Sequence, residues 1–220
     1  SRTYVSDPKK RLLVVKAAMT VNGGAARDLL RNLPAISKKF EVRFLSLNLL
    51  QEQLSKLQSL GIETICPEKQ WEPNGGLWNE ITAGQERSAL AAWKAMNGIQ
   101  DIIDWAEVIH LTGGNGSMEF LKLVPKEKML HLHFLESKPG IHEEINHLNP
   151  DGTGSWRPRI LHFLQTFQRR RIEKSFQSFI GNNKWIVSAN SNFSASKLES
   201  IYKIKGGVLY PSVDLSEFPK

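Results

Sequence analysis

The sequence has little of several features that would restrict its class. It contains one cysteine in 220 residues, Cys66, so no disulfide can form within the chain and a reducing, cytoplasmic setting is expected. No apolar run approaches the roughly 20 residues that a membrane-spanning helix needs, and the first residues lack the apolar core of a signal peptide. Internal repeats and low-complexity tracts are also absent from the sequence. What remains is an ordinary globular composition, with 40% hydrophobic and 23% charged residues.

The positive charge is unevenly distributed. The formal charge of the whole chain is +7, but residues 156–205 contain ten Lys or Arg and two Glu, so this segment alone is +8. A local basic surface suits an anionic partner such as a phosphate group, nucleic acid or an anionic membrane face, whereas the simplest alternative is a solvated helix face.

Within this segment, residues 157–180 show the spacing of one long basic helix with two apolar stripes rotated against each other. Either both stripes face protein core, or one lies against a membrane surface and the protein is peripheral there. The basic residues at the changeover are the candidates for membrane or anion contact: Arg169, Arg170, Arg171 and Lys174. Nucleic acid is not expected as a partner, because the aromatic residues lie at helical core spacing and no standard reading motif is present.

Short apolar segments alternate with helical patterns along the chain. Strands are predicted over residues 11–19, 40–47, 61–67, 107–113, 128–136, 184–190 and 206–214. Helices are predicted over residues 24–33, 51–60, 86–106, 117–124, 157–180 and 193–203. This alternation predicts an α/β fold with a Rossmann-like parallel sheet flanked by helices on both faces.

Ligands of such sheets bind at the carboxyl ends of the strands, so candidate site residues are sought there. After the first strand, Gly23 and Gly24 precede a helix, an arrangement that suits an anion such as a diphosphate but also an ordinary strand-to-helix turn. The residues form neither a dinucleotide fingerprint nor a Walker loop. A second glycine-rich turn, residues 113–116, follows the fourth strand and contains Asn115.

Two histidines of the fifth strand, His131 and His133, are expected on the same face because side chains alternate along a strand. With Glu136 they could bind a metal ion, but a third ligand at a clear spacing is missing, so no metal is expected. A histidine at the carboxyl end of a strand is better placed to hydrogen-bond a hydroxylated ligand. The glycine-rich loops over residues 66–84 and 137–158 are long enough to shape such a site.

Residues 185–218 resemble the end of the N-terminal domain in family-4 glycosyltransferases of the GT-B fold. The matching positions follow the family's order and spacing: Asn190, Ser191, Phe193, Val208, Tyr210, Pro211, Val213, Asp214 and Phe218. The stretch NGGAARDLL is similar to the family's glycine-rich first loop, with Ala26 where the family commonly has Glu. The stretch LHLHFLE resembles the family's His-Phe segment, with His133 in the matching position. The resemblance is patchy and runs from about residue 11 to residue 218.

The resemblance implies an enzyme that transfers a sugar, such as a hexose, from a nucleoside-diphosphate sugar to an acceptor hydroxyl with retained anomeric configuration. Its setting would be glycan, polysaccharide or glycolipid biosynthesis. Residues 1–10 would be a flexible segment, residues 11–214 the acceptor-binding domain, and residues 215–220 the start of a linker to a C-terminal donor-binding domain, in cis or on a separate chain. The isolated domain is expected to be inactive.

The resemblance also assigns roles to residues. Gly23 and Gly24 would bind the donor diphosphate, and His133 would be catalytic. A sugar or lipid-linked acceptor would be held by Asn115, Glu136 and Ser191. The donor is a substrate, and neither a cofactor nor a metal is expected. The main rival is a stand-alone nucleotide- or sugar-binding α/β module without catalysis.

Overall fold

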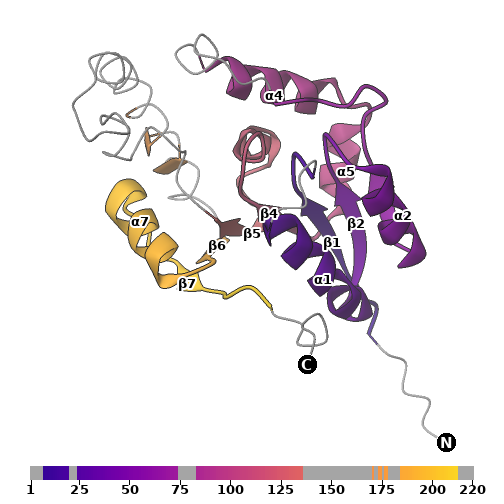
Figure 1. Cartoon of the computed structure of the whole chain (residues 1–220), viewed down its shortest axis with the longest axis horizontal. Helices are drawn as coiled ribbons and strands as arrows, with labels where there is room; N and C mark the ends of the chain where they lie inside the picture. The colour runs from indigo at the N-terminus through magenta and orange to yellow at the C-terminus, as the bar shows by residue number, and fades with distance from the viewer. Residues whose placement is uncertain are drawn as a thin grey trace, which may run out of the picture.

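The sheet is the framework of the molecule. The computed structural model describes residues 7–19, 24–73, 83–135, 170, 173–174, 176–177 and 184–212. Its strands are β1 (Lys10–Val15), β2 (Phe40–Leu45), β3 (Glu63–Ile65), β4 (Val108–Thr112), β5 (Met129–Phe134), β6 (Trp185–Ala189) and β7 (Gly207–Val208). They form one sheet in the order β3-β2-β1-β4-β5-β6-β7, and every pairing is parallel. Figure 1 shows the labelled strands from β2 to β7 following one another across the molecule. The predicted Rossmann-like α/β fold is therefore confirmed.

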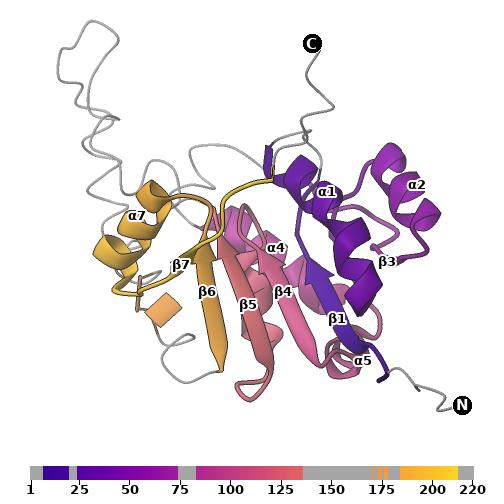
Figure 2. The ribbon, with the colours of Figure 1, turned by 90° about the horizontal axis from the view of Figure 1, so that it is seen from below.

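Helices cover both faces of the sheet (Figure 2). One face packs against α1 (Gly24–Lys39) and α2 (Gln51–Ser59). The other face packs against α4 (Gly84–Ala95), α5 (Ile99–Trp105), the 3₁₀ helix η1 (Met118–Leu123) and α7 (Asn192–Tyr202). Alternation along β1 supplies both cores, because Leu12 and Val14 belong to the α1 side whereas Leu13 and Val15 belong to the α4 side.

The strand order reverses between β1 and β4, which places a topological switch point there. The strands beyond it differ in chemistry between their two faces. On the α4 side, Ile109, Leu111, Leu130 and Leu132 are fully buried. On the α1 side, the same strands carry polar side chains at the alternate positions: His110, Thr112, His131, His133 and Ser188.

The predicted helix over residues 86–106 is wrong as a single element. The structure has two helices there, α4 and α5, because the chain turns at Gly98, whose φ of +67° is in the left-handed region that favours glycine. The apolar stripe that suggested one helix is nevertheless buried, with Ala89, Trp93 and Ile103 all at 0% exposure. Helix α1 in turn extends beyond the predicted residue 33, through Pro34 to Lys39.

Most of the predicted basic helix over residues 157–180 lies outside the described residues. Of the part that is described, Arg170 and Lys174 are exposed, whereas Phe176 is buried with its ring 4.5 Å from that of Tyr202. Phe176 belongs to the second of the two apolar stripes of the predicted helix, so at this position the stripe faces protein core. Among the helices that the structure describes, none combines the length and the hydropathy needed to cross a bilayer.

Candidate functional site

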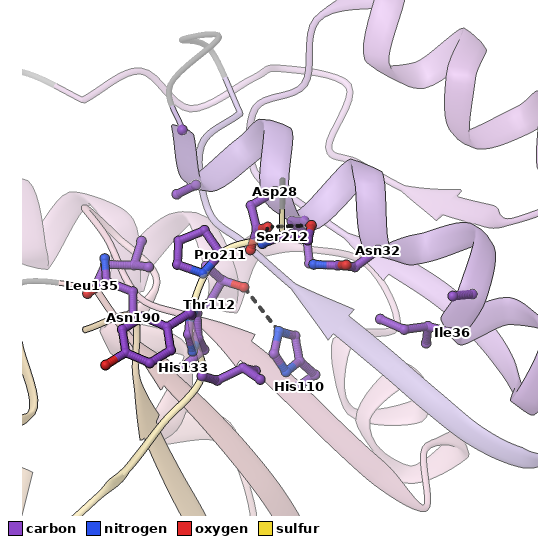
Figure 3. Close-up of a pocket in the computed structure, with 16 residues that line it drawn as sticks. Asp28, Asn32, Ile36, His110, Thr112, His133, Leu135, Asn190, Pro211 and Ser212 are labelled. Atoms are coloured by element: carbon purple, nitrogen blue, oxygen red, sulfur yellow. Dashed lines mark hydrogen bonds between the residues drawn. The ribbon is translucent and has the colours of Figure 1, made fainter. Parts of the chain in front are cut away.

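A cavity of about 690 Å³ lies at the switch point, between α1, the carboxyl ends of β4 and β5, and residues 209–212 (Figure 3). Its apolar wall includes Leu209, Tyr210 and Pro211. Polar side chains from four parts of the chain line the remainder: Asp28, Asn32, His110, Thr112, His133 and Asn190. The cavity is therefore mixed in character and can hold a ligand that carries both hydroxyl groups and apolar surface.

One face of α1 forms a wall of this cavity. Gly24, Asp28 and Asn32 follow one another at a spacing of four residues, so they lie along one side of the helix. A Cβ atom added to Gly24 would meet nothing within 4 Å, so packing within the described residues does not require glycine at this position. The start of α1 consequently leaves room for another molecule to approach its backbone.

Asp28 and Arg31 attach the segment after β7 to α1. Ser212 donates two hydrogen bonds to Oδ1 of Asp28, from its backbone N–H at 2.8 Å and from its hydroxyl at 2.9 Å (Figure 3). Nη1 of Arg31 donates to the carbonyl oxygen of Ser212 at 2.6 Å. These three bonds join residues more than 180 positions apart in the sequence and fix the wall formed by Leu209 and Pro211.

A continuous row of hydrogen-bonded side chains runs across β4, β5 and β6, and we refer to it as the histidine chain. Oγ1 of Thr112 lies 3.2 Å from Nε2 of His110, whose Nδ1 lies 2.9 Å from Nδ1 of His131. Nε2 of His131 lies 2.8 Å from Oγ of Ser188, and the same oxygen lies 2.9 Å from Nδ1 of His133. Strand register explains the row, since His110 is paired with His131 and His133 with Ser188.

Burial favours the neutral form of all three rings. It lowers the pKa of His110 to about 3, with a further contribution from the neighbouring His131 and His133. Burial also lowers the pKa of His131, with His133 adding to the effect. The pKa of His133 is lowered by burial and by Lys16, whereas Asp28 acts in the opposite direction. At neutral pH each ring therefore carries one N–H and one lone pair.

Lys16 is a buried cation at the same edge of the sheet. Lys16 is the residue directly after β1, and it is 7% exposed. Its Nζ donates a hydrogen bond to the carbonyl oxygen of Gly113 at 3.1 Å. It thereby holds the end of β1 against the turn after β4. Its charge lies close enough to His133 to disfavour the protonated ring.

The glycine-rich turn after β4 has a packing role. A Cβ atom on Gly113 would lie 3.2 Å from the carbonyl oxygen of His133. Gly116 has a φ of +80°, and a Cβ atom there would lie 2.8 Å from the ring of Trp71. Its carbonyl oxygen also accepts a hydrogen bond from Nε1 of Trp93 at 2.8 Å. The turn is built for close packing of two tryptophans against the strand ends.

The structure brings some of the predicted site residues together. His133 and Gly24 both line the cavity. Asn115 is exposed in the turn after β4 and does not line it. Ser191 is the N-cap of α7, where its hydroxyl oxygen accepts from the backbone N–H of Ser194 at 3.1 Å. The ligand-binding roles of Asn115 and Ser191 stay predictions.

Other predicted residues cannot be placed against the cavity. Gly23, Glu136, Arg169 and Arg171 lie outside the described residues. Arg170 and Lys174 are exposed, and their contact with an anion or membrane stays a prediction. In the part of the chain that the structure describes, no group of three or more His, Cys, Asp or Glu side chains is arranged to hold a metal ion. Metal independence of the function is untested and stays a prediction.

Sequence reasoning assigned no site role to several residues that lie in or beside the cavity, although the family resemblance includes Asn190. His110, Thr112 and Asn190 were visible near the carboxyl ends of predicted strands, where alternation would have placed His110 and Thr112 on one face. The signal for Asp28 and Asn32 was their spacing of four residues, which puts both polar side chains on one side of α1. The buried residues of this helix are apolar. Lys16 stands inside the apolar segment of residues 11–19, and this position was the sequence signal for its burial.

No protein-family model matches this sequence, and no curated protein matches it significantly. Among solved structures, BdcA from E. coli is similar with a TM-score of 0.35 and 9% identity, over 91% of this chain and 96% of that one. UGT71G1 from Medicago truncatula, solved with UDP-glucose, has a TM-score of 0.46 and 14% identity over 96% of this chain and 54% of its own.

UGT2 from Phytolacca americana, solved with UDP-2fluoro-glucose and pterostilbene, has a TM-score of 0.45 and 12% identity, over 96% of this chain and 56% of its own. The chain thus spans about half the length of these two UGT proteins. Since all these scores and identities are low, the fold assignment rests on the strand order of the chain itself.

Proposed function

We propose that this chain is the acceptor-side domain of a retaining glycosyltransferase, which transfers a sugar from a nucleoside-diphosphate sugar to an acceptor hydroxyl. One observation carries the proposal. The three segments whose sequences resemble the family-4 enzymes are far apart in the chain, yet each contributes to the same cavity. Gly24 comes from the first loop, His133 from the fifth strand, and Asn190 with residues 209–212 from the last segment.

In this proposal the start of α1 approaches the donor diphosphate. Backbone N–H groups of Gly23 and Gly24 would stabilise the charge that develops on the leaving phosphate. The open space around the Cβ position of Gly24 supports this role, because a phosphate group could approach the backbone there.

His133 is the proposed catalytic residue. It lines the cavity beside Thr112 and Asn190, and burial keeps its ring neutral, so it can exchange a hydrogen bond with an acceptor hydroxyl. The acceptor contacts of Asn115, Glu136 and Ser191 are proposed from the resemblance alone, since Asn115 and Ser191 do not line the cavity and Glu136 lies outside the described residues. The acceptor is a sugar or a lipid-linked saccharide, and a C-terminal domain supplies most of the contacts to the nucleotide.

Sugar transfer by the chain, alone and combined with a C-terminal donor-binding domain, tests the proposal. The assay measures nucleoside diphosphate released from a panel of UDP-, GDP- and ADP-sugars with mono- and disaccharide acceptors. We expect no turnover by the chain alone and turnover by the two-domain protein. Turnover by the isolated chain with a defined donor would show that it is not half of an enzyme.

The alternative is a binding module without catalysis, and one observation favours it: this chain supplies both polar and apolar side chains to the walls of the cavity. Calorimetric titration with nucleoside diphosphates, nucleotide sugars and free sugars separates the two possibilities. Tight binding by the isolated chain, with no turnover after a donor domain is supplied, would support the module.

Peripheral association with an anionic membrane is a further part of the proposal. It rests on the four basic residues of the predicted helix, of which Arg170 and Lys174 are described and exposed. Basic residues beside an anionic leaflet each contribute about 1 kcal/mol to binding.

A further inference from the structure

The histidine chain uses nearly all the hydrogen-bonding capacity of its rings. Both nitrogens of His110 are engaged, one by Thr112 and the other by His131. Both nitrogens of His131 are engaged as well, the second by Ser188. His133 differs, because Nδ1 contacts Ser188 while Nε2 makes no hydrogen bond within the described part of the chain. Each end of the histidine chain, Thr112 and His133, lines the cavity.

A neutral imidazole carries one proton, so one of its ring nitrogens donates and the other accepts. The direction of one hydrogen bond in the histidine chain therefore fixes the direction of the next. Suppose that Nδ1 of His133 carries its proton and donates to Ser188. The Ser188 hydroxyl then donates to His131, His131 donates through Nδ1 to His110, and His110 donates through Nε2 to Thr112. In this arrangement, Nε2 of His133 is a lone pair.

The reverse arrangement satisfies the same four contacts. The Thr112 hydroxyl donates to His110, His110 donates through Nδ1 to His131, and His131 donates through Nε2 to Ser188. The Ser188 hydroxyl then donates to Nδ1 of His133, so Nε2 of His133 carries the proton. The two arrangements differ only in direction, and neither places a charge on any ring.

We propose that the histidine chain is a proton relay whose direction determines whether Nε2 of His133 accepts or donates a hydrogen bond in the cavity. The relay itself rests on the side-chain contacts, whereas its use in sugar transfer rests on the proposed function. In that use, His133 accepts the proton of the acceptor hydroxyl and Thr112 releases one to an oxygen of the leaving phosphate.

Protons balance along the relay. As Nε2 of His133 takes up the hydroxyl proton, its Nδ1 proton moves to Oγ of Ser188, and the former Ser188 proton moves to Nε2 of His131. The Nδ1 proton of His131 moves to Nδ1 of His110, and the Nε2 proton of His110 moves to Oγ1 of Thr112. The former Thr112 proton leaves to the phosphate oxygen. One proton enters, one leaves, and every ring stays neutral.

The surroundings favour this neutral transfer over protonation of one ring. Burial and the mutual proximity of the three rings disfavour a positive charge on His110 and His131. His133 faces Asp28 of α1 and Lys16 after β1, whose effects on its protonation oppose each other. A proton accepted at Nε2 is therefore more easily passed on than kept as an imidazolium.

NMR of the protein labelled with ¹⁵N-histidine tests the relay without any substrate. Two-bond ¹H–¹⁵N spectra at neutral pH report which nitrogen of each ring carries the proton. We expect one of two linked sets: Nε2–H on His110 with Nδ1–H on His131 and His133, or the reverse at all three rings. Rings that choose their tautomers independently would overturn the proposal. So would donation from both His131 and His133 to Ser188, or an imidazolium at neutral pH.

Ser188→Ala should disconnect His133 from the rest. We expect the tautomer of His133 to change or to become averaged, while His110 and His131 stay linked to each other. Ser188→Thr keeps the hydroxyl and should restore the wild-type set. Ser200→Ala makes the same chemical change on the exposed side of α7, where Oγ of Ser200 donates to the Lys197 carbonyl, and should leave all three rings unchanged. An unchanged His133 in Ser188→Ala would refute the link.

Kinetics of the two-domain protein test the use of the relay. Ser188→Ala should lower kcat about tenfold to a hundredfold with little change in KM, and Ser188→Thr should recover most of it. If no sugar transfer is found with any donor, the proposed function fails while the tautomer result stands. If sugar transfer is found but Ser188→Ala leaves kcat unchanged, the catalytic use of the relay is refuted.

Discussion

The two faces of strands β4 to β6 show how one set of strands serves two purposes. On the α4 side, six side chains of these strands are buried in a single core cluster, at 0–8% exposure: Ile109, Leu111, Leu130, Leu132, Phe134 and Val187. On the α1 side, the residues between them form the histidine chain. Burying polar groups gains little stability even when all are hydrogen-bonded, and aliphatic residues would serve a core at least as well. The comparison indicates that the apolar face supplies most of the stability, whereas the polar face is retained for its hydrogen-bonding groups beside the cavity.

The largest expected effect is on the free energy of unfolding, and it follows from a substitution on the apolar face. Leu132→Ala should lower the free energy of unfolding by about 2–5 kcal/mol, because it leaves a cavity in a fully buried cluster. Urea denaturation measures the change. Met129→Ala, on the other face of the same strand and 45% exposed, is the control and should cost far less. Similar losses at both positions would contradict the division of roles.

On the polar face, His133→Ala should reduce sugar transfer by the two-domain protein about a hundredfold, because it removes the hydrogen-bonding ring from the cavity. The midpoint of urea denaturation should change little in comparison with Leu132→Ala. Ser200→Ala provides the reference for both measurements. Full activity of His133→Ala would exclude this residue as the catalytic group.

The pH dependence of stability sharpens the comparison at His110. Its folded pKa, about 3, is below the ordinary 6.5, so between these values the unfolded chain binds a proton that the folded chain does not. The stabilisation is therefore complete above about pH 6.5 and is lost as the pH falls toward 3, with a slope of up to about 1.4 kcal/mol per pH unit.

His110→Gln should flatten this part of the curve of unfolding free energy against pH, since glutamine does not titrate. The titratable groups that act on His110 are His131 and His133 from β5, and Asp28 and Lys16 act in turn on His133. Equal slopes in the two proteins would show that His110 is protonated at its ordinary pKa in the folded state.

A smaller effect is expected where α1 holds the segment after β7. Asp28→Ala removes the acceptor of two Ser212 hydrogen bonds, worth about 1.5 kcal/mol together. Amide hydrogen exchange at Ser212 should accelerate about tenfold, whereas the amide of Leu209, which donates to the carbonyl oxygen of Ala189, should change less. Unaltered exchange at Ser212 would show that Asp28 does not hold it in solution.

The smallest effect concerns the exposed basic residues of the predicted helix. Co-sedimentation with anionic vesicles at low and high salt should show salt-sensitive binding, and Lys174→Ala should weaken it about fivefold, or about 1 kcal/mol. Neutral vesicles show how much binding depends on the charge of the lipid. Lys197→Ala in α7 removes one positive charge outside the predicted basic helix and is the control for the loss of charge. Binding that does not depend on the salt concentration or on the lipid charge would contradict the proposed membrane contact of these basic residues.

Much of the fold could be predicted because alternation and length report directly on strands and helices. Alternation also predicted that His131 and His133 share a face, and their common contact with Ser188 confirms it. The pairing of His110 with His131 could not be predicted, because it depends on the register between two strands. The contact of Asp28 with Ser212 likewise requires the tertiary fold.

The sequence contains a signal for the break between α4 and α5, but the helical spacing of the apolar residues on either side outweighs it. Asn97 and Gly98 form a turn dipeptide, but the apolar residues on either side keep a helical spacing across it. The chain satisfies both, because it turns at Gly98 and still returns Ile103 to the cluster that contains Trp93. Apolar spacing indicates which residues are buried and does not indicate whether the backbone between them is continuous.

The bonds from Asp28 and Arg31 to Ser212 also have a mechanical consequence. Force applied to the chain beyond Ser212 does not act first on the two-residue strand β7, because Ser212 is tied directly to the middle of α1. The load passes to the helix that forms one wall of the cavity. A displacement of the chain after Ser212 would therefore be transmitted to α1. It would change the distance between Asp28 of α1 and His133 of β5.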